Sequence, residues 1–322
     1  MIKKNIIFDT DIGVDCDDAC ALALLINLAK KGYCDCDTIT TSSTRIGAVS
    51  TVRAICDYYD YHDYQIGKMS KPAIDADKIN SYALEVFNTF RKSDKAKLSA
   101  VSLIRKKLTN SKDHDITLVC VGPLSNLGRL MKSKADKYSP LTGKELVAKK
   151  VKEAYLMAGV FKEQTGLENL INNQQCPYEW NICQDIDNAI IGVSGLECNV
   201  YFLPGEIGLK VETGITTKSD VNSPVWKSIV SFGKSGGFID KGLADDQVSY
   251  QRFSWDPLTV LSAILPENDY LDYSKPGKAT VNKDGSTSFE YNPNGKHYVI
   301  KFKDKEDIYL KTQNFINENI KK

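Results

Sequence analysis

A single stretch near the start of the chain constrains what this protein can fold into. Residues 6–8 are an apolar run with strand character, and residues 19–26 form an apolar run that is typical of a buried helix. Five aspartates lie within the ten residues from 9 to 18: Asp9, Asp11, Asp15, Asp17 and Asp18. The acids therefore lie on the turn from a strand end to a helix start, and in an open α/β sheet this edge is where ligands bind.

Five like charges in so short a span repel one another unless a cation or heavy solvation relieves them. A plainer alternative is a helix N-terminus, where Asp17 or Asp18 caps backbone amides and complements the helix dipole. That alternative explains one or two of the five acids. Since acids with perturbed pKa values concentrate at functional sites, we expect the cluster to be one.

Expected strands and helices alternate along most of the chain, which favours an α/β fold: a mostly parallel, doubly wound (Rossmann-like) sheet with helices on both faces. Short strands near 279–281, 288–291 and 298–302, separated by turn signals, predict a small antiparallel C-terminal meander before a last helix. Residues 138–149 are expected to form an exposed basic insertion. With no internal repeat and no low-complexity linker, residues 1–322 are expected to form a single domain, with 279–302 as its antiparallel extension.

The bulk composition excludes several classes of function. The chain has 42 Lys and Arg against 41 Asp and Glu, so no basic surplus marks a partner among nucleic acids or membranes. The first apolar run is too short for a signal peptide or a membrane span. The nine cysteines are odd in number and lack paired CxxC spacing, which favours reduced thiols in a cytoplasmic protein. The chain has three histidines, and none stands at zinc-ligand spacing from another ligand. The sequence therefore favours neither a zinc site nor a histidine-based triad.

Three later patches are also unusual, and their order along the chain matters. Residues 121–126 (Val-Gly-Pro-Leu-Ser-Asn) follow a buried strand, although Asn126 could equally cap the next helix. Residues 172–181 are rich in amides and acids, and residues 252–257 place an acid beside an indole. With the opening cluster, these patches resemble nucleoside hydrolases of the inosine-uridine preferring type. The bacterial branch has the first motif DTDIGxDxDDAxAL, which residues 9–22 match.

The resemblance implies calcium-dependent hydrolysis of the N-glycosidic bond of ribonucleosides to ribose and free base. In the family pattern Asp11 is a calcium ligand and the general base that activates a calcium-bound water. Asp18, the Val121 carbonyl and Asp256 complete the protein ligands. Ca²⁺ prefers roughly six to eight hard oxygen ligands, which carboxylates, a carbonyl and sugar hydroxyls supply. A dense anionic wall would stabilise the oxocarbenium-like sugar of the transition state.

The resemblance also implies how the sugar is held. Asn173, Glu179 and Asn181 match positions that bind the ribose hydroxyls. The acid motif is two residues longer than in the best-known members, so either Asp17 or Asp15 would bind the ribose diol. The expected partner is a small nucleoside or ribosyl compound, and the resemblance implies a homo-oligomer, either a dimer or a tetramer.

Two positions depart from the family pattern. Trp255 stands where many relatives have a histidine, which resembles a purine-specific branch in which tryptophan stacks on the base. The resemblance therefore implies purine nucleosides as the expected preferred substrates. Arg45 stands where relatives usually have an asparagine that touches the sugar. Its side chain is long enough to reach a phosphate or acidic group on the sugar, or to point to solvent.

Two rival functions stay open at this point. Asp9 and Asp11 also suit the nucleophile pair of a haloacid-dehalogenase-type phosphatase, although Gly13 stands where that family expects threonine or valine. The other rival is a ribosyl-ligand binding protein that has lost turnover, motivated by Arg45 and the missing histidine.

Overall fold

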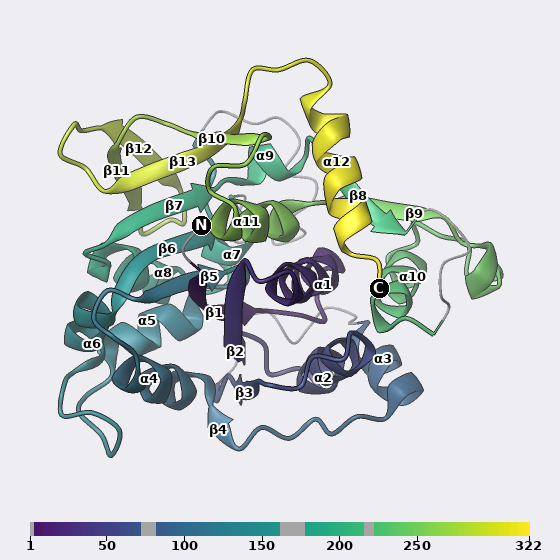
Figure 1. Cartoon of the computed structure of the whole chain (residues 1–322), viewed down its shortest axis with the longest axis horizontal. Coiled ribbons are helices and arrows are strands. Elements are labelled where there is room, and N and C mark those ends of the chain that lie inside the picture. The colour runs from purple at the N-terminus through teal and green to yellow at the C-terminus, as the bar shows by residue number, and fades with distance from the viewer. Residues whose placement is uncertain (1–2, 72–81, 162–177, 216–221) are drawn as a thin grey trace.

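A computed structural model describes residues 3–71, 82–161, 178–215 and 222–322. Eleven strands of the described chain form one large sheet (Figure 1). Its strands are β1 (Lys4–Thr10), β2 (Cys34–Thr41), β3 (Gln65–Lys68), β4 (Leu98–Ser99), β5 (Ile116–Cys120), β6 (Val151–Met157), β7 (Asn199–Leu203), β10 (Leu271–Tyr273), β11 (Gly277–Val281), β12 (Thr287–Tyr291) and β13 (His297–Phe302). A separate two-stranded sheet pairs β8 (Glu212–Ile215) with β9 (Tyr250–Phe253).

The strand order is β12-β11-β13-β7-β6-β5-β1-β2-β3-β4, with β10 paired to β13. All pairs from β7 to β4 are parallel, and β13 is parallel to β7. β11 and β12 are antiparallel to each other, as are β11 and β13. The predicted mostly parallel sheet with an antiparallel C-terminal part is confirmed. The three final strands do not follow one another in space, because β11 lies between β12 and β13. β13 joins this group to the main sheet by pairing with β7.

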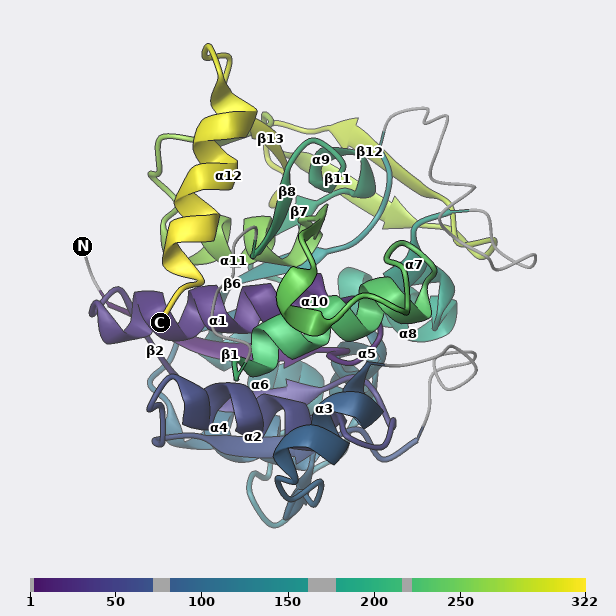
Figure 2. The same ribbon diagram turned by 90° about the vertical axis from the view of Figure 1, so that its right-hand side faces the viewer.

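Helices cover both faces of the sheet (Figures 1 and 2). The helices are α1 (Asp17–Lys30), α2 (Ala48–Tyr58), α3 (Ala83–Phe90), α4 (Ala100–Asn110), α5 (Ser125–Lys132), α6 (Gly143–Lys150), α7 (Trp180–Cys183), α8 (Ile186–Gly195), α9 (Gly205–Gly208), α10 (Pro224–Ser235), α11 (Trp255–Ile264) and α12 (Ile308–Asn319), with a 3-10 turn, η2, at Asp245–Gln247. None of these helices is long and apolar enough to cross a membrane.

Each face of the sheet has its own apolar core. One core joins the sheet to α1, α2, α10 and α11, and the other joins it to α4, α5, α6 and α8. Eleven of the fourteen residues of α1 are buried, because this helix packs between the sheet and the helices α10, α11 and α12. This explains why its sequence is apolar on nearly every side, unlike that of a surface helix.

The sequence missed some elements. Residues 138–149 are not simply an exposed insertion, since α6 forms there and buries Leu146 and Val147. A capping box begins this helix: Thr142 accepts from the Glu145 N–H while the Glu145 side chain accepts from the Thr142 N–H. The expectation of reduced thiols is also wrong for Cys183, which is disulfide-bonded.

Helices α5 and α8 approach closely at Gly128, which gives a first test of the fold. A Cβ atom there would lie 2.4 Å from the Asn188 carbonyl oxygen and 2.6 Å from the Asn188 Cα. Glycine to alanine in a helix is ordinarily stabilising by about 0.5–1 kcal/mol. Here the neighbour is backbone, so we expect Gly128→Ala to lower the free energy of unfolding by about 1–3 kcal/mol, measured by urea denaturation.

The matched control is Gly192→Ala on the facing helix. Its Cβ would meet Leu127 side-chain atoms at 3.0 and 3.1 Å, and a side chain can shift. We expect a smaller loss for this variant. Equal stabilities for the two variants would contradict the close backbone approach.

Candidate active site

Four buried carboxylates gather at the carboxyl edge of the sheet. Asp11 follows β1, Asp17 and Asp18 begin α1, and Asp256 lies in the first turn of α11; each is at most 5% exposed. Carboxylate oxygens of Asp17, Asp18 and Asp256 lie within 4.8 Å of one another. The sequence placed Asp11, Asp17 and Asp18 at a strand-to-helix turn. The fold brings Asp256 to them from more than two hundred residues away.

Local hydrogen bonds explain the shape of the loop between β1 and α1. The Thr10 hydroxyl donates to Asp18 Oδ1 and accepts from the Ile12 N–H at 3.1 Å. Gly13 has φ = +115°, in the region that favours glycine. Asp17 Oδ2 accepts from the N–H groups of Trp255 and Asp256, each at 3.1 Å. Asp17 therefore caps the N-terminus of α11 as well as beginning α1, and it ties the two helices that carry the cluster.

The electrostatics of the cluster follow from burial. Burial, together with neighbouring carboxylates, raises the pKa of Asp17, Asp18 and Asp256 well above the usual range. Burial also raises the pKa of Asp11, to about 7, against the opposing charge of Arg45. Oxygen ligands this close and this poorly solvated are what a hard divalent cation requires, so the cluster fits a metal ion.

Asp11 is placed by its contact with Gly122. A Cβ atom at Gly122 would lie 2.7 Å from both Asp11 N and Asp11 Oδ1, and 2.4 Å from Ser42 Oγ. The main chain after β5 therefore runs directly against the Asp11 carboxylate. Val121, the residue before Gly122, donates its N–H to the Asp9 carbonyl at 2.8 Å.

The third patch meets the second at the ends of β5 and β6. The Asn181 side-chain amide donates to the Val121 carbonyl at 2.8 Å and to the Met157 carbonyl at 3.0 Å. Glu179 accepts from the N–H groups of Gly159, Asn181 and Ile182 at 2.7–3.1 Å, and burial raises its pKa to about 7.

Glu179, Asn181 and Val121 are thus brought together. Asn173, predicted to bind ribose, lies outside the described residues.

Asp9 has a different environment from the other acids. Its Oδ1 accepts from Thr40 Oγ1 at 2.5 Å and from Asn126 Nδ2 at 2.8 Å, and Asn126 also donates to the Thr41 carbonyl. Asn126 makes no side-chain cap of α5. Asp9 is therefore part of a buried junction between β1, β2 and α5.

The remaining predicted residues lie around the cluster. Asp15 accepts from the Arg252 guanidinium, with the shortest contact at 2.6 Å, so this acid already has a cationic partner. Trp255 is 9% exposed; its indole N–H donates to the Gly205 carbonyl at 2.7 Å, and its ring packs where Gly208 lacks a side chain. Arg45 is 7% exposed, and its charge acts on Asp11.

Comparison with known proteins identifies the family. The model of the family "inosine-uridine preferring nucleoside hydrolase" matches residues 6–306. The chain belongs to this family. By family, this nucleoside hydrolase is an N-glycosyl hydrolase. No curated protein sequence matches the chain.

Solved structures show the same fold at low sequence identity. A purine-preferring ribonucleoside hydrolase from Gardnerella vaginalis is similar with a TM-score of 0.68 and 17% identity over 99% of each chain. An inosine-uridine preferring nucleoside hydrolase from Bacillus anthracis gives 0.66 and 16%, over 98% of this chain and 99% of that one. A plant nucleoside hydrolase, PpNRh1, gives 0.66 and 19% over 98% of each chain.

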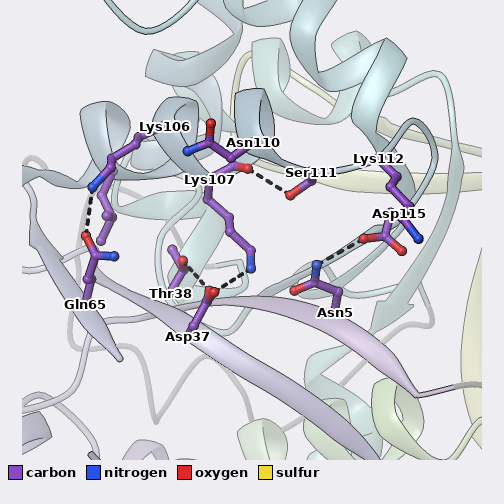
Figure 3. Close-up of a pocket in the computed structure, with 11 residues that line it drawn as sticks. Asn5, Asp37, Thr38, Gln65, Lys106, Lys107, Asn110, Ser111, Lys112 and Asp115 are labelled. Atoms are coloured by element: carbon purple, nitrogen blue, oxygen red, sulfur yellow. Dashed lines mark hydrogen bonds and ion pairs between the residues drawn. The ribbon is translucent and has the colours of Figure 1, made fainter. Parts of the chain in front are cut away.

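A pocket of about 350 Å³ at the opposite edge of the sheet is separate from this cluster (Figure 3). It lies where β1, β2 and β3 meet the end of α4. Lys107 pairs with Asp37 at 2.7 Å and Asn5 donates to Asp115 at 3.0 Å, so these polar groups satisfy one another. No member of the acid cluster lines it.

The approach of Gly122 to Asp11 gives a test of the site. In Gly122→Ala the new methyl group would displace the Asp11 carboxylate, and a misplacement of about 1 Å can cost about a hundredfold in rate. We expect kcat/KM for nucleoside hydrolysis to fall by about this factor while the circular dichroism spectrum is unchanged. Gly195→Ala, which meets only the Met131 side chain, is the control and should keep full activity. Full activity in Gly122→Ala would contradict the placement of Asp11.

Proposed function

We propose that this nucleoside hydrolase cleaves the N-glycosidic bond of ribonucleosides with Ca²⁺ held by Asp11, Asp18, Asp256 and the Val121 carbonyl. The observation that carries the proposal is the buried group formed by Asp17, Asp18 and Asp256 in a chain of this family. Asp11 lies close enough for its charge to act on Asp18 and Asp256. Calcium accepts a mixture of carboxylate and carbonyl ligands in flexible geometry. When bound, the ion would supply positive charge that draws sugar hydroxyls and water to the cluster.

Asp11 is the proposed general base. Its carboxylate is 5% exposed, and burial raises its pKa, which makes it a stronger base than a solvated aspartate. In the reaction it would take a proton from the attacking water as the oxygen bonds to the anomeric carbon. The bond from that carbon to the nucleobase breaks, and the electron pair of the bond leaves with the nucleobase.

The other carboxylates hold the sugar and stabilise its charge. Asp17 keeps Oδ2 on the amides of α11, and we propose that its other oxygen binds the ribose diol. A carboxylate has about four lone-pair sites, and Glu179 uses three for backbone amides, which leaves one for a ribose hydroxyl. A wall of negative groups would stabilise the oxocarbenium-like transition state.

Purine nucleosides are the proposed preferred substrates, on the basis of Trp255. Its N–H is already bound to the Gly205 carbonyl, so the indole can stack on a base but cannot donate a proton to it. The leaving base would take its proton from solvent.

The phosphatase alternative has less support. It requires Asp9 as a nucleophile, but Asp9 is 2% exposed and its Oδ1 is held by Thr40 and Asn126. A nucleophile must reach its substrate, whereas these contacts suit a structural acid.

Incubation with nucleosides tests the activity and the metal together. We expect inosine and adenosine to release ribose, measured as reducing sugar, faster than uridine and cytidine. Removal of calcium by a chelator should abolish release, and added Ca²⁺ should restore it. Release that is unaffected by chelation would contradict the metal assignment, and no release from any nucleoside would contradict the proposed activity.

The role of Asp11 has its own test. Asp11→Asn keeps the shape of the side chain but removes the base, so we expect kcat to fall by about 10²–10⁴-fold. The control is Asp35→Asn, an exposed acid paired with Lys3 on the surface, which should retain wild-type kcat. Activity that survives in Asp11→Asn at the control level would show that another group accepts the proton.

A further inference from the structure

The pair formed by Asp15 and Arg252 is the strongest feature around the cluster that the proposed function leaves without a role. Arg252 Nε lies 3.0 and 2.9 Å from the two Asp15 oxygens, and Nη2 lies 2.6 Å from Oδ2. The Arg252 side chain is 13% exposed and the Asp15 side chain is 27% exposed. Asp15 Oδ1 also accepts from the Cys16 N–H at 2.7 Å, so its carboxylate fixes the main chain just before Asp17.

The guanidinium of Arg252 is held in one position by aromatic rings. Its Cζ lies 5.2 Å from the ring centroid of Phe232, 5.3 Å from Trp255, 5.7 Å from Phe253 and 5.9 Å from Phe238. Each ring face attracts the cation, and together the rings restrict its rotation. An isolated surface ion pair contributes little to stability, whereas a partly buried pair with fixed geometry contributes more.

The pair joins the same two segments that supply the metal ligands. Asp15 lies two residues before Asp17. Arg252 lies in β9, four residues before Asp256. Asp17 already links these segments by accepting from the main chain of α11. Asp15 and Arg252 form a second link between these segments, and α1 packs against both α10 and α11.

We propose that Asp15 and Arg252 are positioning residues that set the separation of Asp17 and Asp18 from Asp256, and thereby the affinity of the site for its metal ion. The inference rests on the proposed calcium site. The two residues that lengthen the acid motif place Asp15 where it reaches Arg252 and leave Asp17 at the cluster. Asp15 then serves the metal site without touching metal or sugar.

Calcium binding to the full chain, measured by isothermal titration calorimetry, tests the proposal. Residues that orient metal ligands typically change metal affinity by about 10–100-fold when replaced, so we expect Asp15→Asn and Arg252→Gln each to raise the Kd for Ca²⁺ by at least about tenfold. The double variant should bind no more weakly than the worse single variant, because both changes remove one interaction. Arg252→Lys keeps the charge but loses the fork geometry, so its Kd should lie between those of wild type and Arg252→Gln.

The matched control is Asp136→Asn. Asp136 pairs with the buried Arg105 at 2.9 and 3.0 Å, far from the cluster, so this variant should lower the Tm without changing the Kd for Ca²⁺. If Asp15→Asn and Arg252→Lys also lower only the Tm, the positioning role is overturned. If wild type binds no Ca²⁺, the calcium site and this role fall together. If wild type binds Ca²⁺ but hydrolyses no nucleoside, the proposed activity fails while the Kd comparison still decides the positioning role.

Discussion

The cost of burying several carboxylates side by side is the constraint on which the rest of this structure depends. Asp17, Asp18 and Asp256 each repel the others, and burial raises the free energy of their ionised forms. The chain offsets part of this cost with the amides of α11 on Asp17, the hydroxyl of Thr10 on Asp18 and the charge of Arg252 near Asp17. A parallel sheet makes this feasible, because its carboxyl edge gathers strand ends and helix N-termini whose amides favour negative charge.

The same constraint explains why α1 is buried. A helix that begins in the cluster must run back across the sheet, and α10, α11 and α12 then cover it. The apolar residues of α1 therefore hold its first turn, with Asp17 and Asp18, at a fixed place over β1. The packing of the core on this face of the sheet therefore also sets the geometry of the site.

How much of the fold could be predicted from the sequence depended on how far apart along the chain the interacting residues lie. The strand at residues 5–10, the helix that starts at Asp17 and the strand before Val121 have strong local patterns, and the structure contains all three. β3 and β4 are short, with little apolar alternation, and β8 pairs with β9 across about 35 residues, so no local pattern marks them. The helix α6 did carry a local signal, the Thr142–Glu145 capping box, which the lysines around it obscured.

The site shows the same limit more sharply. Acid spacing and family resemblance brought Asp11, Asp18, Val121 and Asp256 to attention, but they could not distinguish Asp15 from Asp17. The distinction depends on partners on another segment: the amides of residues 255 and 256 for Asp17, and Arg252 for Asp15. The guanidinium holds the Asp15 carboxylate, whereas Asp17 uses one oxygen for two amides, and its second oxygen is the one that we propose binds the sugar. Five similar aspartates thus acquire different roles from what packs against each of them, and not from their order in the motif.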